Sequence, residues 1–421
     1  MKDFSVDQFS AIVGIDWADQ KHDIHEYDVA KAKVANRAVI SSKPEAVHGW
    51  ASSLRQRYPG KPVAVACELK KGPLIFALMK YEHIVIFPLH PKSVAKYREA
   101  FASSGAKSDP TDAELQSEML RTHMHRFTPI LPDTPEVRAL AQFVECRRKL
   151  VQDRVDLTNS LTHYLKNYYP QVLDWFKEKD TTIFADFIIR WPSLSQVKRA
   201  RRNTLIDFMH RHNVRYQKTI DDRISAAREA IALTDDEGVI APNQFMAEQL
   251  AIQLKIMLGS IEAIEKEIAV RYRSLADREI FDSFPAAGAQ FAPRLLVAFG
   301  SNRDRYQDAS ELQKYAGIAP VIKASGKSSW THWRYACPKF LRQTFVEWAG
   351  MTPRYSFWAR AYYEQQEAKG KEHNTIIRSL AFKWIRIMFK CWKERKPYDE
   401  SKYLQALKDR GSPLIKHLAN A

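Results

Sequence analysis

The first hundred residues alternate short apolar runs with amphipathic segments, and this order restricts the fold more than any other feature of the chain. Runs of strand length end abruptly at polar residues, and segments with helical periodicity separate the later ones. Three strands followed by helix, strand, helix, strand and helix predict a mixed α/β sheet with helices on its faces. We expect strands at 10–16, 22–29, 37–42, 61–68 and 83–90, and helices at 44–57, 73–82 and 91–101.

Beyond this region the hydrophobic period becomes that of long helices. Residues 134–169 carry one continuous apolar stripe, and residues 243–275 carry a second. Two such helices predict an antiparallel coiled-coil hairpin or a dimer interface. From about residue 276 the pattern is helical, with a loop-rich centre around "KASGKSS" (323–329). We therefore expect three domains: an α/β domain at 1–128, a helical spacer at 129–275 and a mostly α-helical domain at 276–421.

The charge balance indicates a polyanionic partner. The chain has 421 residues, of which 45% are hydrophobic and 27% are charged, with a net charge of +16. This excess of lysine and arginine favours nucleic acid. A membrane is disfavoured, since no apolar run approaches the roughly 18 residues needed to span a bilayer. The start resembles no signal peptide, and four scattered cysteines without a CxxC pair indicate a reducing compartment. A cytoplasmic, nucleoid-associated protein is expected.

Basic side chains concentrate on two predicted helical segments. The insert at 191–212 contains "KRARR", and the helix at 134–169 carries further arginines beside its apolar stripe. Each set is either a solvated helix face or a surface that contacts phosphates. The candidate nucleic-acid-binding residues in these segments are Arg147, Arg148, Lys198, Arg199, Arg201 and Arg202.

Two aspartates in "AKSDPTDAEL" (106–115) admit two interpretations. Asp109 can cap a helix that starts at Pro110, with Asp112 closing a capping box. Both carboxylates can instead project from the helix start toward a metal ion. The two roles are compatible with each other.

Two further acids favour the metal interpretation. Asp16 and Glu68 each end an apolar strand, where a carboxylate is difficult to explain as packing. Four acids meeting at one sheet edge repel one another unless divalent cations neutralise them, and oxygen ligands suit Mg²⁺, with Mn²⁺ as a possible substitute. A pair of such ions is the usual apparatus for phosphodiester displacement. By contrast, we expect His22, His25 and Glu26 to lie on a solvated strand face.

These motifs resemble a known family. Asp16 in "GIDWADQKHD", Glu68 in "ACELKKG" and the pair in "AKSDPTDAEL" resemble the DEDD tetrad of a RuvC-like, ribonuclease H-type domain. The whole chain is similar to the DEDD transposases of bacterial insertion sequences related to the Piv DNA invertases. Its "YAGIAPVIKASGKS" resembles their "YAGLAP…SGK" segment, and residues 358–389 resemble their C-terminal helix pair. "ELKKG" and "FPAAGAQF" depart from the usual Glu-Pro-(Thr/Ser)-Gly-Gly and "PGIG" patterns.

The resemblance implies a bridge-RNA-guided serine recombinase. It assigns catalytic and metal-binding roles to Asp16, Glu68, Asp109 and Asp112, and aligns Ser325 with the nucleophile of that family. Lys323 and Lys327 would neutralise phosphate charge beside that serine. The implied partners are donor and target DNA, a structured non-coding bridge RNA and further copies of the chain in a homodimer or homotetramer.

Two alternatives remain open from the sequence. In the first, the protein is a metal-dependent nuclease of the junction-resolvase kind, in which water attacks the phosphodiester and Ser325 is incidental. In the second, it is a catalytically silent RNA-binding scaffold that keeps the fold, which the altered "ELKKG" segment suggests.

Overall fold

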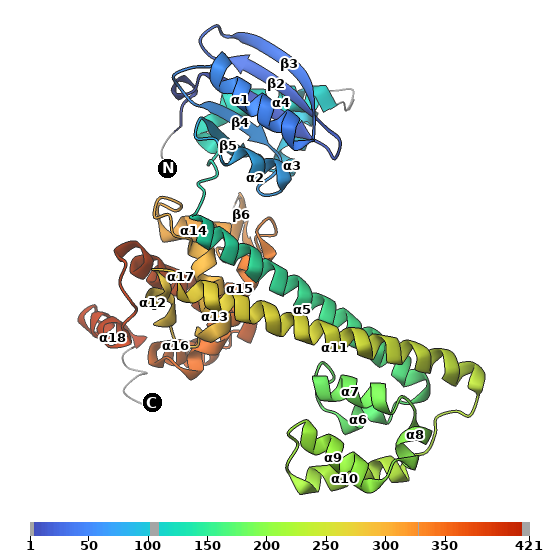
Figure 1. The fold of residues 1–421 in the computed structure, drawn as a ribbon. Helices are drawn as coiled ribbons and strands as arrows, with labels where there is room; N and C mark the ends of the chain where they lie inside the picture. Colours follow the sequence, from blue (N-terminus) through green and yellow to red (C-terminus); the bar gives the residue numbers. More distant parts are fainter. Residues whose placement is uncertain (1–3, 102–108, 327, 415–421) are drawn as a thin grey trace. The chain divides into compact units, whose positions relative to one another are not determined.

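The computed structural model describes residues 4–101, 109–326 and 328–414, without the side chains of residues 101, 109 and 110. The chain forms two compact units, Met1–Pro132 and Asp133–Ala421 (Figure 1). Among the described residues, no helix is long and apolar enough to cross a membrane.

The first unit is built on a five-stranded mixed sheet with the strand order β3-β2-β1-β4-β5. β1 pairs antiparallel with β2 and parallel with β4, and β4 pairs parallel with β5. These pairings confirm the mixed α/β sheet that the sequence predicted. Its strands are β1 Ala11–Trp17, β2 Lys21–Asp28, β3 Lys33–Ser41, β4 Val63–Cys67 and β5 Ile84–Pro88. Its helices are η1 Val6–Gln8, α1 Pro44–Arg57, α2 Pro73–Leu78, α3 Pro91–Phe101, α4 Asp109–His123 and η2 Met124–Arg126.

Helices cover both faces of this sheet, because alternate residues of each strand point to opposite sides. Val13 and Val65 pack in one core with Trp50 of α1, whereas Ile12 and Ala66 belong to a second core with Leu120 of α4. Odd-numbered residues of β1 and β4 therefore face α1 and α2, and even-numbered residues face α3 and α4.

Helix α4 lies very close to β1 at a single glycine. A Cβ atom added to Gly14 would lie 1.9 Å from the carbonyl oxygen of Ala113 and 2.6 Å from the backbone nitrogen of Ser117. The Ser117 hydroxyl donates a hydrogen bond to the carbonyl of Ile12 at 3.3 Å. Only glycine permits this approach.

The polar strand β2 is buried, so the expectation of a solvated face for its histidines and acid was wrong. His22, His25 and Glu26 are 4%, 5% and 0% exposed. The reason is tertiary: β2 lies between β1 and β3, with helices over both faces. Glu26 is satisfied there, because its carboxylate accepts hydrogen bonds from the Arg57 guanidinium, the Trp50 indole and the Tyr58 hydroxyl.

The second unit begins with two long helices that lie side by side in antiparallel directions. Arg147 pairs with Glu265 at 2.5 Å near one end, and Asn167 donates to Asn243 at 2.7 Å near the other. Five short helices lie between them in the sequence and share an aromatic core with the adjoining ends of the two long helices. The helices are α5 Pro135–Tyr168, α6 Val172–Trp175, α7 Thr182–Arg190, α8 Leu194–Arg199, α9 Arg202–Arg211, α10 Gln217–Glu229 and α11 Glu237–Arg273.

The remaining helices of this unit surround a core rich in tryptophan. Trp348, Trp358, Trp384 and Trp392 are all fully buried in it. The helices are α12 Arg278–Asp282, α13 Gly288–Phe299, α14 Ala309–Tyr315, α15 Lys339–Met351, η3 Thr352–Arg354, α16 Phe357–Glu367, α17 His373–Glu394 and α18 Glu400–Asp409.

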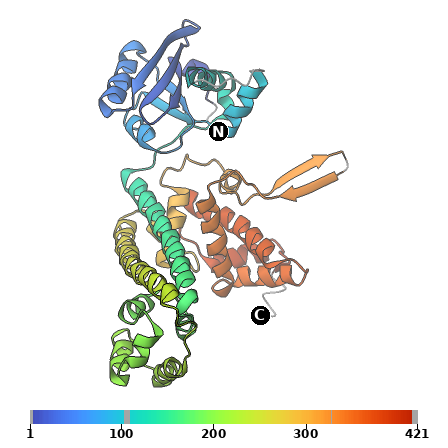
Figure 2. The same ribbon diagram turned by 90° about the vertical axis from the view of Figure 1, so that its right-hand side faces the viewer.

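A β-hairpin replaces the polar loop that the sequence predicted around residue 325. Strands β6 (Val321–Ser325) and β7 (Ser328–His332) pair antiparallel, and Figure 2 shows them extending away from the helices of their unit. Gly326 adopts a φ of +58°, a value that suits glycine at a tight turn. The polar composition of the turn concealed two short strands on either side of it.

The close approach at Gly14 yields a stability prediction. Gly14→Val places a side chain against the α4 backbone, so the free energy of unfolding should fall by about 3 kcal/mol. Gly49→Ala in α1 is the control, because an added Cβ there meets nothing within 4 Å. That control should gain up to about 1 kcal/mol from helix propensity. Urea unfolding measures both, and equal stability of the two variants would contradict this packing.

Candidate functional site in the first unit

Asp16 lies near the end of β1, and Glu68 directly follows the neighbouring strand β4. Ile15 of β1 and Cys67 of β4 are register partners in a parallel pair, and the two acids directly follow them. Asp16 occupies an even-numbered position of β1 and so faces α3 and α4, whereas Glu68 is the first residue beyond β4. Each is half-buried. The carboxyl ends of two adjacent parallel strands therefore present two carboxylates side by side, as the sequence predicted.

Helix α4 brings its first turn toward the same end of β1. Ser117 contacts Ile12, and one turn earlier in the helix Ala113 contacts Gly14. The helix thus runs antiparallel to the strand, and its start points toward Asp16. Asp109 is the first residue of α4, and its side chain lies outside the described residues.

Asp112, in this first turn, is buried and ion-paired. Its carboxylate is 3% exposed and lies 2.5 Å from the guanidinium of Arg98 on α3. An arginine therefore already neutralises this carboxylate. Any metal ion that used Asp112 would have to displace Arg98 from it.

A further carboxylate, which the sequence did not single out, faces the same end of the sheet. Asp23 of β2 is the direct register partner of Asp16, and directly opposed residues share one face. It is 4% exposed and pairs with Lys21 at 3.4 Å. Its position in an alternating polar strand gave no signal, because only strand pairing places it beside Asp16.

The electrostatics of the strand ends agree with this placement. Burial, together with the negative charges of Glu68 and Asp16, raises the pKa of the Cys67 thiol to about 12. The thiol is therefore neutral and packs as an apolar group. Burial is also the main cause of the lowered pKa of His25, which keeps this imidazole neutral although Glu114 lies 3.7 Å away.

The donor chemistry of the site suits a hard divalent cation only in part. Asp16 and Glu68 supply two carboxylates of the kind that Mg²⁺ and Mn²⁺ prefer. Within residues 4–101, 109–326 and 328–414, no group of three or more histidine, cysteine or acidic side chains is placed to hold a metal ion. A complete ligand set therefore needs either Asp109 or the release of Asp112 from Arg98.

Ser325 lies in the other unit, at the end of strand β6. It is exposed, and its register partner is Ser328. Lys323, two residues earlier on the same face, is paired directly with the half-exposed Trp330. The hairpin therefore presents a hydroxyl, an ammonium and an indole on one surface. Lys327, also predicted to bind phosphate, lies outside the described residues.

The predicted nucleic-acid-binding cations differ in their surroundings. Arg147 pairs with Glu265, and Lys198 donates to the carbonyl of Ala230 at 2.8 Å. Arg148 and Arg202 are exposed but also ion-paired, with Glu145 at 3.0 Å and with Asp221 at 2.5 Å. Arg199, the last residue of α8, and Arg201, the residue before α9, are exposed.

This fold and its carboxylates are consistent with a RuvC-like domain of the DEDD type, and comparisons with known proteins agree. Residues 13–170 match a family model for IS110-type DEDD transposases, and residues 278–364 match a model described as the transposase IS116/IS110/IS902 family.

Three relatives are similar over most of the chain. A mini-circle protein of Streptomyces coelicolor, named as a transposase for IS117, is 28% identical over 94% of this chain and 97% of its own length. A protein of insertion element IS110 from the same species is 23% identical, covering 92% of this chain and 95% of its own. An IS116 protein of Streptomyces clavuligerus is 25% identical over 79% and 82%. The chain belongs to the IS110/IS116/IS902 family of transposases.

The ion pair at Asp112 generates a metal-dependent stability prediction. Arg98→Leu leaves a buried carboxylate without its cation and should lower the free energy of unfolding by about 3 kcal/mol. If a metal ion can reach Asp112, adding Mg²⁺ should restore part of the lost thermal stability. The matched control is Arg98→Leu with Asp112→Asn, which has no carboxylate for the ion. Equal responses of the two variants to Mg²⁺ would assign Asp112 a purely structural role.

Proposed function

We propose that this transposase cuts and rejoins DNA through a nucleophilic serine, Ser325, assisted by divalent metal ions at the carboxylates of its first unit. The observation that carries the proposal is the placement of Asp16 and Glu68 at adjacent parallel strand ends, with the start of α4 directed toward them. We assign the metal site to residues 1–128, the role of a helical spacer to residues 129–275 and the nucleophile to residues 276–421.

The proposed metal ligands are Asp16, Glu68, Asp109 and Asp112. When bound there, Mg²⁺ or Mn²⁺ supplies positive charge to the scissile phosphate and favours ionisation of an attacking hydroxyl. In the absence of the ion, Arg98 would neutralise the buried carboxylate of Asp112, and the ion would replace Arg98 there. Asp23, directly opposite Asp16, adds negative charge at the same strand end.

In the proposed step, the Ser325 hydroxyl attacks phosphorus, a deoxyribose oxygen leaves as the DNA strand breaks, and the serine proton passes to that oxygen, which becomes a hydroxyl. One phosphodiester bond is lost and one phosphoserine bond is formed, so the bond energy is conserved and no nucleotide cofactor is consumed. Attack by a second DNA end on the phosphoserine reverses the exchange and joins the strands. Lys323 is placed to neutralise the phosphate, and Trp330 to pack against the adjoining sugar or base.

We further propose that a structured non-coding RNA directs the reaction by pairing with donor and target DNA. Support comes from the resemblance to RNA-guided members of this family and from the net charge of +16 on a chain without a recognisable base-reading module. Exchange of strands between two duplexes requires two or more active sites, so the working form is a homodimer or a homotetramer.

Replacing the serine separates recombination from hydrolysis. Ser325→Ala should lose cleavage and joining together while keeping the fold, because the side chain is exposed and contributes little packing. The measurement is strand cleavage, with denaturing gels to detect a covalent protein–DNA adduct. Ser329→Ala on the opposite hairpin face is the control and should stay active. Vigorous nicking by Ser325→Ala would instead support a water-using nuclease.

Mixing two inactive variants tests whether protomers share an active site. Asp16→Asn removes a ligand charge with little change of shape, and should abolish cleavage while DNA and RNA binding persist. If the serine and the carboxylates of one site come from different protomers, co-assembled Asp16→Asn and Ser325→Ala chains should regain partial activity. A mixture that stays inactive despite demonstrated subunit exchange would place both sets of residues in one chain.

The exposed arginines at the end of α8 and before α9 test the proposed RNA contact. Arg199→Gln with Arg201→Gln should weaken RNA binding and reduce the salt slope by about 1.4, because two fewer counterions are released from a single strand. Lys198 and Arg202 are engaged within the protein, so they are left unchanged. Binding at several salt concentrations measures the effect, and an unchanged slope would mean that this segment is a solvated surface.

A further inference from the structure

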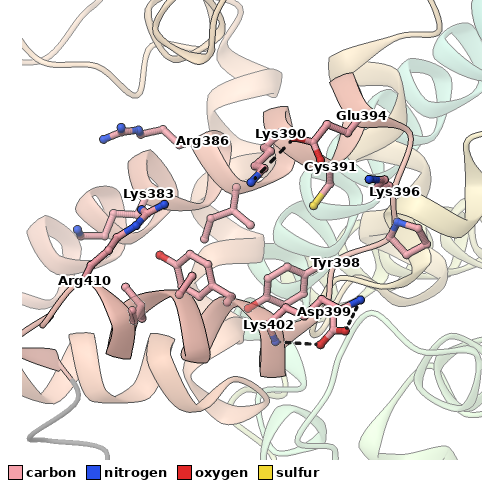
Figure 3. A pocket seen from close by; sticks show the side chains of 15 residues that line it. Lys383, Arg386, Lys390, Cys391, Glu394, Lys396, Tyr398, Asp399, Lys402 and Arg410 are labelled. Atoms are coloured by element: carbon pink, nitrogen blue, oxygen red, sulfur yellow. Dashed lines mark hydrogen bonds and ion pairs between the residues drawn. The ribbon is translucent and has the colours of Figure 1, made fainter.

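A cavity of about 510 Å³ lies between α17 and α18, in the second unit. Figure 3 shows its labelled side chains, which come from α17, from the loop before α18 and from α18 with its C-terminal end. None of the residues assigned above to catalysis or to nucleic-acid binding lines it. Its walls are formed by Lys383, Arg386, Ile387, Lys390, Cys391, Glu394, Lys396, Pro397, Tyr398, Asp399, Lys402, Tyr403, Ala406, Leu407 and Arg410.

The floor of this cavity is apolar, aromatic and neutral. Ile387, Leu407 and the two tyrosines, Tyr398 and Tyr403, are half-buried. Burial raises the pKa of both phenols, so neither carries charge near neutral pH. Tyr398 is also fixed in orientation, because its ring stacks on Phe284 at 5.4 Å and its hydroxyl accepts a hydrogen bond from an indole. Such a floor is preorganised for a flat, uncharged ring.

The rim of the cavity is cationic and only partly neutralised. Lys390 lies 3.9 Å from Glu394, and Lys402 lies 3.2 Å from Asp399. In the part of the chain that the structure describes, the other four rim cations make no ion pair within 4.0 Å. These four are Lys383, Arg386, Lys396 and Arg410.

The rim cations also repel one another. Burial, and then the charge of the neighbouring Arg386, lowers the pKa of Lys383. An anion bound at the rim would relieve this repulsion, since opposite charge favours the ionised lysine. The site therefore combines a neutral aromatic floor with positive charge at its edge that no described carboxylate neutralises.

A nucleotide has these two complementary parts, a flat base and an anionic phosphate. The cavity volume lies within the range typical of small-ligand sites and is large enough for one nucleotide with its flanking phosphates. Duplex DNA keeps its bases paired and stacked, and extruding one costs a few kcal/mol. Structured RNA offers unpaired bases in its loops, and proteins commonly stack these on aromatic side chains.

We infer that this cavity binds one unpaired RNA nucleotide, with the base against Tyr398 and Tyr403 and the flanking phosphates at Arg386 and Arg410. The inference rests on the proposed RNA partnership and adds a specific contact to it. The cavity would anchor a loop of the RNA on the second unit. This anchor is separate from the hairpin that carries Ser325.

Photocrosslinking of the full-length protein tests the inference. The probe is a single-stranded RNA of about ten nucleotides, a length typical of single-strand sites, containing 4-thiouridine. Crosslinked peptides are identified by mass spectrometry, and affinity is measured by fluorescence anisotropy. A DNA of the same sequence with 4-thiothymidine forms the second arm.

Two variants address the two parts of the site. Arg386→Gln with Arg410→Gln removes rim charge from exposed positions, and should weaken RNA binding about tenfold through lost phosphate contacts. Arg354→Gln with Lys408→Gln is the control, since it removes equal charge from exposed positions outside the cavity. Ala406→Trp fills the floor without changing charge, and should abolish the crosslink.

The outcomes separate this inference from the function it rests on. Crosslinks to the peptide containing Tyr398 or Tyr403, lost in Ala406→Trp, support the cavity. RNA that binds without such crosslinks, or equal affinities of the two charge variants, would overturn the cavity and leave the RNA partnership standing. Preferential labelling of the cavity by DNA would overturn its assignment to RNA. No detectable RNA binding at all would remove the proposed partnership as well.

Discussion

The contact between α4 and β1 at Gly14 determines the geometry of the first unit. It fixes the distance between helix and strand, because any side chain at this position would overlap the α4 backbone. It also fixes direction, since the helix runs back along the strand and starts at the end where Asp16 lies. Residues separated by almost a hundred positions in sequence are thereby brought to one edge of the sheet.

Two buried carboxylates of the first unit are neutralised in different ways. Glu26 is fully buried and receives hydrogen bonds from three side chains of the α1 region, so its position is fixed by several donors. Among the described side chains, Asp112 is paired with one guanidinium, that of Arg98. A carboxylate with a single partner can exchange that partner for another cation, whereas one enclosed by several donors cannot do so without loss of structure. The proposed exchange for a metal ion is therefore compatible with the pairing of Asp112, whereas the several donors around Glu26 favour a structural role.

The lysine and arginine side chains of the protein fall into two groups: those that pair with acids of the protein and those that remain exposed. Several cations on the long helices and the insert satisfy acids within the protein, as Arg147 does with Glu265. Others remain exposed, including Lys323 beside Ser325 and the rim of the cavity between α17 and α18. The net charge therefore indicates a polyanionic partner but not where it binds. Whether a given cation neutralises an acid of the protein or is available to contact a phosphate depends on its ion pairs in the structure.

The sequence alone determined the order of strands and helices in the first unit, the apolar stripes of the two long helices and the acids at the ends of two strands, because these follow from local patterns. It did not reveal the burial of His22 and His25, the position of Asp23 opposite Asp16 or the pairing of Asp112 with Arg98. Nor did it distinguish the hairpin around Ser325 from a polar loop. Each of these depends on which segments become neighbours, and strand pairing and helix packing join residues that have no local relation in the chain. Tertiary structure alone decided which polar groups share an environment.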